Sequence, residues 1–404
     1  MHAVICGAGI AGLAAAISLH RSGWQVTLVE RAPSLRDGGY MIDFFGPGYD
    51  AAERIGILEA LRERAADTDT VDWTDGRGRV RARIHYSRIR EAMDGKLFPL
   101  LRGDVERILA AALPDAVRVH FGTTVTHVQD HHDRVDVTLE VTGSDHEALV
   151  VSADLLIGAD GIGSGVRELV FGPHREYLRP LGLHTAAWFV DADDDLRAHL
   201  GGRFLMMSVP GRLVGVYEVG ETQVAAFLAF LEDSADIPVD PLDEIRRRYA
   251  DLGGFMPSVL AAEPVGEVYY DLVAQVRMPS WRRGRVLLIG DAAYAVSLVA
   301  GQGASLALAG GVAVGEALRG VTDPADIEPA LAAFEARVRP AVESTQDGGR
   351  RTAAWFVPAT RARVALRNLI LIVSDLPLLA RVLSPFQTVD AKGWAPVPRS
   401  GEVR

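Results

Sequence analysis

Residues 7–12 read Gly7-Ala8-Gly9-Ile10-Ala11-Gly12, and this glycine-rich stretch decides the fold. It follows an apolar run at residues 2–6 that predicts a buried strand, and it opens a segment at residues 10–21 whose apolar spacing predicts a helix. The first glycine permits a tight turn, the second lets the backbone approach a pyrophosphate, and the third allows close helix–strand packing. The helix N-terminus then presents unpaired N–H groups and partial positive charge to the phosphates.

A carboxylate stands at the end of the second predicted strand, residues 25–29. Glu30 follows Gly12 by 18 residues, close to the spacing of about 20 at which an acid binds the ribose of a dinucleotide. Because this carboxylate would repel a 2′-phosphate, the resident ligand is expected to be FAD or NAD and not NADP. The glycine motif and Glu30 leave the choice between FAD and NAD open.

Two later segments favour FAD. Residues 155–164 read LLIGADGIGS, an apolar strand that ends in a Gly/Asp turn, although an ordinary strand–turn–helix has the same composition. Residues 286–293 read VLLIGDAA and lead to AGQGA at 300–304. There a strand delivers Asp291, whose carboxylate can accept a ribitol hydroxyl, and the following helix N-terminus can stabilise negative charge on a flavin.

In this order and spacing the three motifs resemble the para-hydroxybenzoate hydroxylase superfamily of class A FAD-dependent monooxygenases, and above all its tetracycline-inactivating and polyketide-tailoring members. The resemblance covers residues 1 to about 355. It implies an α/β fold: a Rossmann-like FAD-binding domain, an inserted antiparallel β-sheet substrate domain and C-terminal helices. It also implies an enzyme of secondary metabolism that uses NADPH or NADH and O2 to hydroxylate or epoxidise an aromatic, polyketide or related small molecule through a flavin C4a-hydroperoxide.

The resemblance further implies cofactor contacts at individual positions. Glu30 and Arg31 would hold the adenosine ribose, and Asp160 would serve both FAD and the transient NADPH or NADH, with Arg36 as a second contact of the nicotinamide dinucleotide. Residues 301–304 would lie under the flavin ring. The whole expected cofactor-binding set is Gly7, Gly9, Ala11, Gly12, Glu30, Arg31, Asp43, Arg102, Asp160, Asp291, Gly301, Gln302, Gly303 and Ala304.

Substrate contacts are expected from the strand-rich residues 175–280 and from the loop around Tyr40. The candidates are Tyr40, Met41, Arg203, Met206, Tyr217 and Tyr269. For each of them a core or surface position is the simpler interpretation, since strand side chains mostly pack. The family chemistry resides in the cofactor, so few acid–base groups are needed; Tyr217 or His184 could deprotonate a phenolic substrate.

Two departures from the family pattern fall beside the expected flavin. Tyr294 follows GDAA where relatives have histidine or a small residue, and Leu298 stands where they have proline. Without proline the backbone φ is less restricted, so oxygen transfer is less secure than FAD binding. Two alternatives therefore stay open: a flavin-dependent reductase or oxidase on the same fold, and a non-catalytic FAD protein that sequesters a small molecule.

The order of strand and helix patterns predicts a divided FAD-binding domain. Its first part covers residues 1–174, with a small β-rich section at about 70–150, and its second part covers residues 281–355. Between them, residues 175–280 are expected to form the substrate-binding sheet. Residues 356–404 are expected to form C-terminal helices.

Composition limits the partners and the location. The net charge of −11 disfavours nucleic acid and anionic membranes. Cys6 is the only cysteine, which excludes an intramolecular disulfide and a cysteine-based metal site; no HExxH pattern occurs either, and no metal is expected.

Residues 364–386 look apolar but contain charged residues and Pro377, whereas a membrane span needs about 20 predominantly apolar residues. Because Met1 leads directly into the first strand, without room for a signal peptide, we expect a cytoplasmic protein of undetermined oligomeric state.

Overall fold

The three motifs follow strands of one parallel sheet. The computed structural model describes residues 1–35, 40–66, 68, 70–143, 148–220, 222–297, 301–374 and 394. The strand order of this sheet is β17 (Arg282–Arg283), β18 (Val286–Leu288), β11 (Leu155–Gly158), β1 (His2–Cys6), β2 (Gln25–Val29) and β7 (Arg118–His120), all parallel except β17. The carboxyl ends of parallel strands meet at one edge of a sheet, which is where ligands bind in open α/β folds. All three motifs are therefore brought to the same edge.

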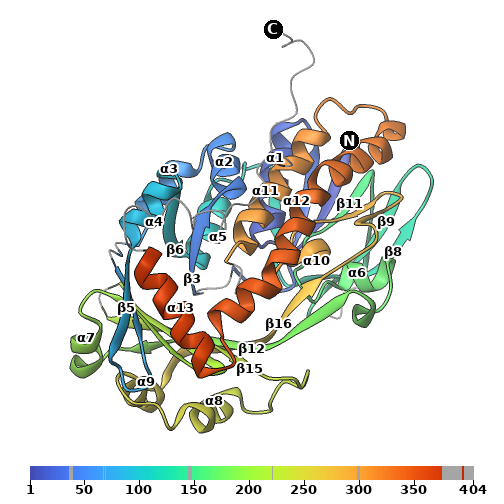
Figure 1. The fold of residues 1–404 in the computed structure, drawn as a ribbon. Coiled ribbons are helices and arrows are strands. Elements are labelled where there is room, and N and C mark those ends of the chain that lie inside the picture. Colours follow the sequence, from blue (N-terminus) through green and yellow to red (C-terminus); the bar gives the residue numbers. More distant parts are fainter. Residues whose placement is uncertain are drawn as a thin grey trace.

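Two glycines allow a close pair of helices beside this sheet. Helix α1 (Ile10–Arg21) packs against α11 (Gly303–Ala317), and the two run side by side in Figure 1. A Cβ atom added at Gly311 would lie 2.5 Å from the Ala11 carbonyl oxygen, and one added at Gly315 would meet Ser18. The Ser18 hydroxyl donates instead to the Val312 carbonyl oxygen at 3.0 Å. The glycine motif is thus tied to a segment almost 300 residues later.

A second, larger sheet lies at the other end of the molecule (Figure 1). Its order is β16 (Pro264–Val276), β12 (Leu178–Asp191), β15 (Gln223–Leu231), β14 (Arg212–Val219), β13 (Phe204–Val209), β4 (Thr70–Thr74) and β5 (Val80–His85). One face packs on α7 (Asp194–Leu200), α8 (Pro241–Tyr249) and α9 (Met256–Ala261). The other face packs on α12 (Ile327–Phe356) and α13 (Arg361–Ser374). The α/β fold expected from the sequence, with a parallel sheet, an inserted antiparallel sheet and C-terminal helices, is confirmed.

The stretch at residues 70–150 differs from the single small section expected there. β4 pairs in parallel with β13 and so extends the large sheet, because Val71 and Trp73 lie beside Phe204 and Met206. The later strands β8 (Thr123–Asp130), β9 (Val135–Val141) and β10 (Leu149–Ala153) form a separate three-stranded antiparallel sheet. The domain limits at 174, 280 and 355 stay predictions.

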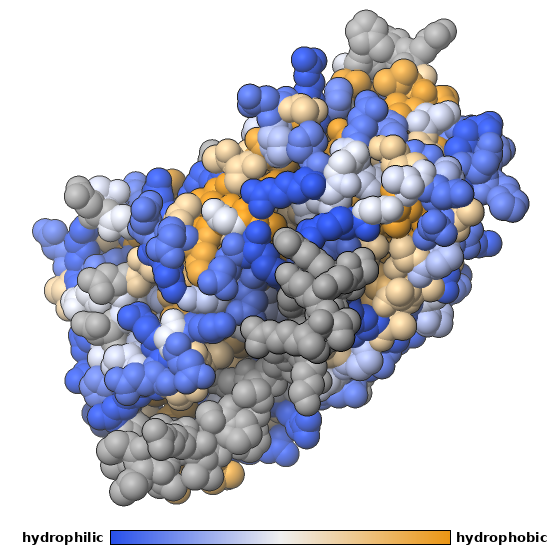
Figure 2. All heavy atoms as spheres, turned by 90° about the horizontal axis from the view of Figure 1, so that it is seen from above, coloured by the Kyte–Doolittle hydropathy of each residue, from blue (hydrophilic) through white to orange (hydrophobic). Residues whose placement is uncertain are grey.

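The remaining elements connect and cover these sheets. They are α2 (Pro47–Arg54), α3 (Leu58–Glu63), α4 (Tyr86–Ala92), α5 (Arg102–Ala111), α6 (Gly165–Val170), α10 (Asp291–Tyr294), the short 3₁₀ turns His174–Glu176 and Pro324–Asp326, and the two-stranded sheet of β3 (Met41–Phe45) and β6 (Leu97–Leu101). On the face shown in Figure 2, hydrophilic side chains surround smaller hydrophobic patches. Of the helices in the described ranges, none combines the length and apolarity needed to cross a membrane.

Candidate active site

The glycine loop closes against the segment that carries Asp160. Gly7 adopts a φ of +105°, and a Cβ atom there would lie 2.5 Å from the Ala159 carbonyl oxygen. A Cβ atom at Gly12 would approach the Gly7 carbonyl oxygen far inside the 3.0 Å that real side chains keep. At Gly9, by contrast, only the Glu106 carboxylate comes within 4 Å, at 3.6 Å. Gly7 and Gly12 therefore serve packing, and Gly9 leaves the backbone open to a ligand.

Glu30 holds the rim of this loop from the end of β2. One carboxylate oxygen accepts a hydrogen bond from the Ala8 N–H and the other from the Ala32 N–H, both at 2.8 Å. Arg31 next to it is exposed. The acid expected at the adenosine ribose thus lies directly beside the glycine loop, with a second lone pair on each oxygen free for ligand hydroxyls.

The segments around Asp160 and Asp291 pack beside the glycine loop and are tied to each other. Gly290, which precedes Asp291, lies so close to α1 that a Cβ atom there would be 2.8 Å from the Ala11 Cβ. Arg167 connects the two segments: its guanidinium is buried and donates to the Ala292 carbonyl oxygen at 2.8 Å and to the Ile162 carbonyl oxygen at 2.5 Å. Sequence reasoning missed Arg167, because nothing in its spacing shows which distant carbonyl it reaches.

Asp160 has a clear local role in addition to the predicted ligand role. Its carboxylate accepts from the Ser164 hydroxyl at 2.5 Å and from the Val166 N–H at 3.1 Å, so it fixes the start of α6. Burial raises the pKa of Asp160, although these hydrogen bonds oppose the shift. Its contact with a dinucleotide stays a prediction.

Arg102 and Asp291 lie close enough to Tyr40 and Tyr269 for their charges to interact, and we call the space among these four residues the hollow. The Arg102 guanidinium pairs with Glu106 at 2.9 Å, one helical turn along α5, a spacing visible in the sequence. Asp291 is exposed to solvent, but protein surrounds its carboxylate on several sides. The resulting loss of hydration raises the pKa of Asp291, and the nearby Arg102 charge offsets only part of this rise. Asp43 lies on β3, where burial raises the pKa of its carboxyl group and the Tyr86 hydroxyl donates to it; its contact with FAD stays a prediction. The Asp291 carboxylate and the Arg102 guanidinium are suited to binding hydroxyl and phosphate groups.

The expected flavin loop shows an unsatisfied acceptor. Gln302 Oε1 is buried without a hydrogen-bond partner among the described residues, and a Cβ atom at Gly303 would be 4.0 Å from Asp291. Gly301 has a φ of +67° and nothing within 4 Å of its Cβ position. A buried amide oxygen without a partner costs free energy, so the loop fits a group that brings its own N–H or O–H donor, as a flavin does. Ala304 follows at the start of α11; Leu298 and Arg36 lie outside the described residues.

Aromatic side chains form one wall of the hollow. The Tyr40 ring lies 5.8 Å from that of Phe227 and 6.2 Å from that of Tyr269. The Tyr217 hydroxyl accepts a hydrogen bond from the Met41 N–H. Four of the expected pocket residues are thus brought together, and Met206 belongs to the same face of the large sheet, since it pairs with Gly215 two residues before Tyr217.

Tyr217 is unsuited to the role of base that the sequence suggested. Its side chain is buried, and burial raises its pKa well above the ordinary value for tyrosine. The phenol therefore keeps its proton at neutral pH. It can donate a hydrogen bond to a substrate oxygen but cannot readily take a proton from it.

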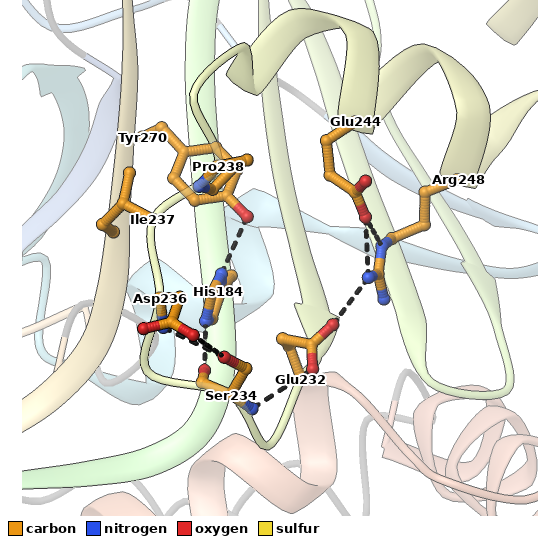
Figure 3. Close-up of a pocket in the computed structure, with 9 residues that line it drawn as sticks. All are labelled: His184, Glu232, Ser234, Asp236, Ile237, Pro238, Glu244, Arg248 and Tyr270. Carbon is orange, nitrogen blue, oxygen red and sulfur yellow. Dashed lines mark hydrogen bonds and ion pairs between the residues drawn. The ribbon is translucent and has the colours of Figure 1, made fainter.

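His184 lies on the opposite face of the large sheet. It pairs with Phe230, whereas Tyr40 contacts Phe227, and side chains three positions apart on a strand point to opposite faces. Its ring nitrogens contact the Tyr270 hydroxyl at 2.7 Å and the Ser234 carbonyl oxygen at 2.8 Å, beside a cavity of about 250 Å³ on the α8 side (Figure 3). His184 and Tyr217 therefore cannot act on the same bound molecule.

Arg203 is also held away from the aromatic wall. Its guanidinium pairs with Asp72 at 3.0 Å, and Arg83 pairs with the same buried carboxylate at 2.5 Å. Asp72 shares the sheet face of the apolar Leu205, which packs on the α7–α9 side. The structure thus gives Arg203 a structural partner and places it outside the hollow.

Replacing Asp72 by asparagine should destabilise the fold in a pH-dependent way. Burial raises the pKa of Asp72, but the hydrogen bonds and charges of Arg83 and Arg203 outweigh it, and the net shift is downward. A lowered pKa stabilises the folded state above the unfolded value of about 4 and loses this effect as the pH falls through the folded value. We expect D72N to lose about 1–3 kcal/mol at pH 7, with the difference narrowing below about pH 4; urea unfolding at both pH values measures it. If D72N and wild type differed by the same free energy of unfolding at both pH values, the Asp72 carboxylate would not stabilise the fold through its ion pairs.

Sequence comparison with known proteins places the chain in a family that binds FAD. The family model described as FAD binding domain matches residues 1–347. The uncharacterized protein Rv1260 of Mycobacterium tuberculosis is 34% identical over 356 residues, which cover 85% of this chain and 91% of that protein. A flavin-dependent monooxygenase from an unknown prokaryotic organism is 28% identical, with 86% and 88% covered.

Solved structures with a similar fold include a tetracycline destructase and a protein complexed with FAD. Tetracycline destructase Tet(55) is 26% identical with a TM-score of 0.76, covering 95% of this chain and 97% of its own. Klebsiella pneumoniae HpxO, complexed with FAD and uric acid, shares the fold at 21% identity and a TM-score of 0.79, covering 96% of each chain. The chain belongs to the FAD-binding monooxygenase family of the para-hydroxybenzoate hydroxylase type.

Proposed function

We propose that the protein is a monooxygenase that uses NADPH or NADH and O2 to hydroxylate or epoxidise an aromatic, polyketide or similarly conjugated small molecule. The observation that carries this proposal is the aromatic wall of Tyr40, Phe227 and Tyr269 beside the carboxylate of Asp291. Burial raises the pKa of Tyr40 to about 12, with the Asp291 charge adding to the shift. Planar rings recognise planar apolar molecules by offset stacking.

The residues around the hollow are suited to hold FAD. The glycine loop and the N-terminus of α1 would bind its pyrophosphate, Glu30 its ribose and Asp291 its ribitol, and residues 301–304 would lie under its ring. When bound, FAD supplies the acceptance of a hydride from NADPH or NADH and the activation of O2. The protein orients the substrate, and its aromatic wall excludes water from the reacting groups. The Tyr217 hydroxyl can donate a hydrogen bond to a substrate oxygen.

The proposal is tested by aerobic oxidation of NADPH and NADH with a panel of phenols and polyketides. We expect a yellow purified protein, oxidation of one of the two donors that accelerates with a productive compound, and a product 16 mass units heavier, which corresponds to one added oxygen. Hydrogen peroxide as the sole oxygen product across the panel would support an oxidase or a reductase instead. Tight binding of a compound from the panel, without oxidation of NADPH or NADH, would support a protein that only sequesters that compound.

Tyr217→Phe should weaken substrate binding without removing the cofactor. Loss of one neutral hydrogen bond costs about 0.5–1.5 kcal/mol, so we expect KM for a phenolic substrate to rise about two- to tenfold, while kcat changes by less than about threefold and the FAD content is unchanged. Steady-state kinetics measure both constants.

Tyr270→Phe is the matched control, because Tyr270 lies on the opposite face beside His184. It should leave KM unchanged. A collapse of kcat in Tyr217→Phe together with a shifted pH profile would show that the tyrosine acts as a base after all.

A further inference from the structure

A second cavity lies on the side of the large sheet that faces α12 and α13. Its volume is about 390 Å³, within the range of small-molecule pockets, about 300–1,000 Å³. The sheet contributes Pro180, Leu181, Leu183 and Leu231, and the helices with their connection contribute Ala353, Ala354, Val357, Ala359 and Arg363. Among the described residues, the side chains that line the cavity are therefore apolar apart from the Arg363 guanidinium.

This cavity is separate from the proposed cofactor hollow. Leu231 lies four residues beyond Phe227 of the aromatic wall, about 13 Å along β15 at roughly 3.3 Å per residue. Between them Ala229 is fully buried, in the apolar cluster that also contains Leu183, Ala353 and Val357. Packed side chains thus divide the two spaces.

The last turns of α12 and the whole of α13 carry unbalanced positive charge. Residues 348–374 contain five arginines and no aspartate or glutamate, in a chain whose net charge is −11. Arg363 is exposed, and among the described residues no hydrogen bond or ion pair holds its guanidinium. An unpaired cation at the mouth of an apolar cavity attracts anions by its long-range field.

Arg367, one helical turn further along α13, strengthens this charge. Only 2% of it is exposed, and its guanidinium lies 4.1 Å above the centre of the Trp73 ring. Its hydrogen bonds go to the Ser208 hydroxyl, the Phe356 carbonyl oxygen and the Asn368 amide oxygen, and its Nε has no partner among the residues that the structure describes. In the described part of the chain no carboxylate pairs with Arg367, and a buried guanidinium in that state is costly. Trp73 belongs to the same apolar cluster as three residues that line the cavity.

We propose that this cavity binds a small amphiphilic carboxylate, whose apolar body lies between the sheet and α12 and whose carboxylate pairs with Arg363, with Arg367 adding positive charge behind it. Neither arginine has an acid partner among the described residues, so the bound anion supplies the missing counter-charge. Because the site is separate from the cofactor hollow, it goes beyond the proposed function and does not depend on it.

Calorimetric titration of the cofactor-loaded protein with decanoate, below its micelle concentration and at pH 8, tests the site. We expect saturable binding at one site, and weaker binding of uncharged 1-decanol by about tenfold. Inorganic phosphate should not displace decanoate, because it lacks an apolar body. No saturable binding, equal affinity for decanol or displacement by phosphate at comparable concentrations would each overturn the proposal.

Variants separate this cavity from other places where decanoate could bind. Arg363→Gln should weaken decanoate about tenfold and leave decanol unchanged, whereas Arg361→Gln removes the same charge from the same helix outside the cavity and should have little effect. Ala354→Trp fills the cavity from an exposed position and should abolish binding of both compounds. Equal losses in Arg361→Gln and Arg363→Gln would indicate unspecific attraction. Binding that survives in Ala354→Trp and perturbs the flavin spectrum would place decanoate in the cofactor hollow, and both results would overturn the proposal.

Discussion

Gly12→Ala is expected to yield a protein that holds less than about a tenth of the wild-type FAD, or that fails to fold. Alanine has the higher helix propensity by about 1 kcal/mol, so a change inside α1 should be favourable if only local structure counted. The added Cβ atom, however, would overlap the Gly7 carbonyl oxygen and come within 3.4 Å of the Ala159 side chain. Backbone cannot move aside as a flexible side chain can, so the turn that faces the phosphates must be displaced.

The ratio of flavin absorbance to protein, combined with circular dichroism, distinguishes a folded apoprotein from an unfolded one. Gly348→Ala is the matched control: it is also a helical glycine, in α12, but nothing lies within 4 Å of its Cβ position. It should keep full FAD content and gain up to about 1 kcal/mol of stability. Normal FAD content in Gly12→Ala would show that the loop tolerates displacement and that its close packing is not required for the cofactor.

Glu30→Ala is expected to weaken FAD binding about 10- to 100-fold while the chain stays folded. Hydrogen bonds to a charged group contribute about 1.5–3 kcal/mol, and the variant removes the carboxylate proposed to hold the ribose hydroxyls. It also leaves the Ala8 N–H without its acceptor at the entrance of the glycine loop. Titration of the apoprotein with FAD, followed by quenching of flavin fluorescence, gives the dissociation constant.

Glu63→Ala, a change at an exposed acid on α3, controls for the lost negative charge. It should leave the dissociation constant within about twofold of wild type. A change below threefold in Glu30→Ala would mean that the two backbone hydrogen bonds are the whole role of Glu30.

The parts of the fold that sequence predicted best are those in which each local pattern has one solution. A glycine motif between an apolar strand and a helix specifies a parallel βαβ unit, and Gly7, Gly12 and Glu30 lie as that unit requires. Asp291 could be placed because a strand must deliver it to the same sheet edge. These positions depend on backbone geometry, which a short stretch of sequence encodes.

Side chains of the large sheet were harder to place, since a shift of one residue reverses the face. His184 and Tyr217 were equal candidates in the sequence, yet they lie on opposite faces. Arg203 could not be separated from a ligand-binding arginine, because its partner Asp72 is 131 residues earlier in the chain. The same distance in sequence concealed the pairing of β4 with β13.

The close contact of α1 with α11 has a consequence for synthesis of the chain. The Ser18 hydroxyl donates to the Val312 carbonyl oxygen, 294 residues later, so at about 5–20 residues per second the ribosome needs about 15–60 s to produce the partner. Until then the Ala- and Leu-rich side of α1 has no native cover. The first helix of the chain is therefore among the last to be completed by tertiary packing, and its small side chains keep the exposed surface modest during that delay.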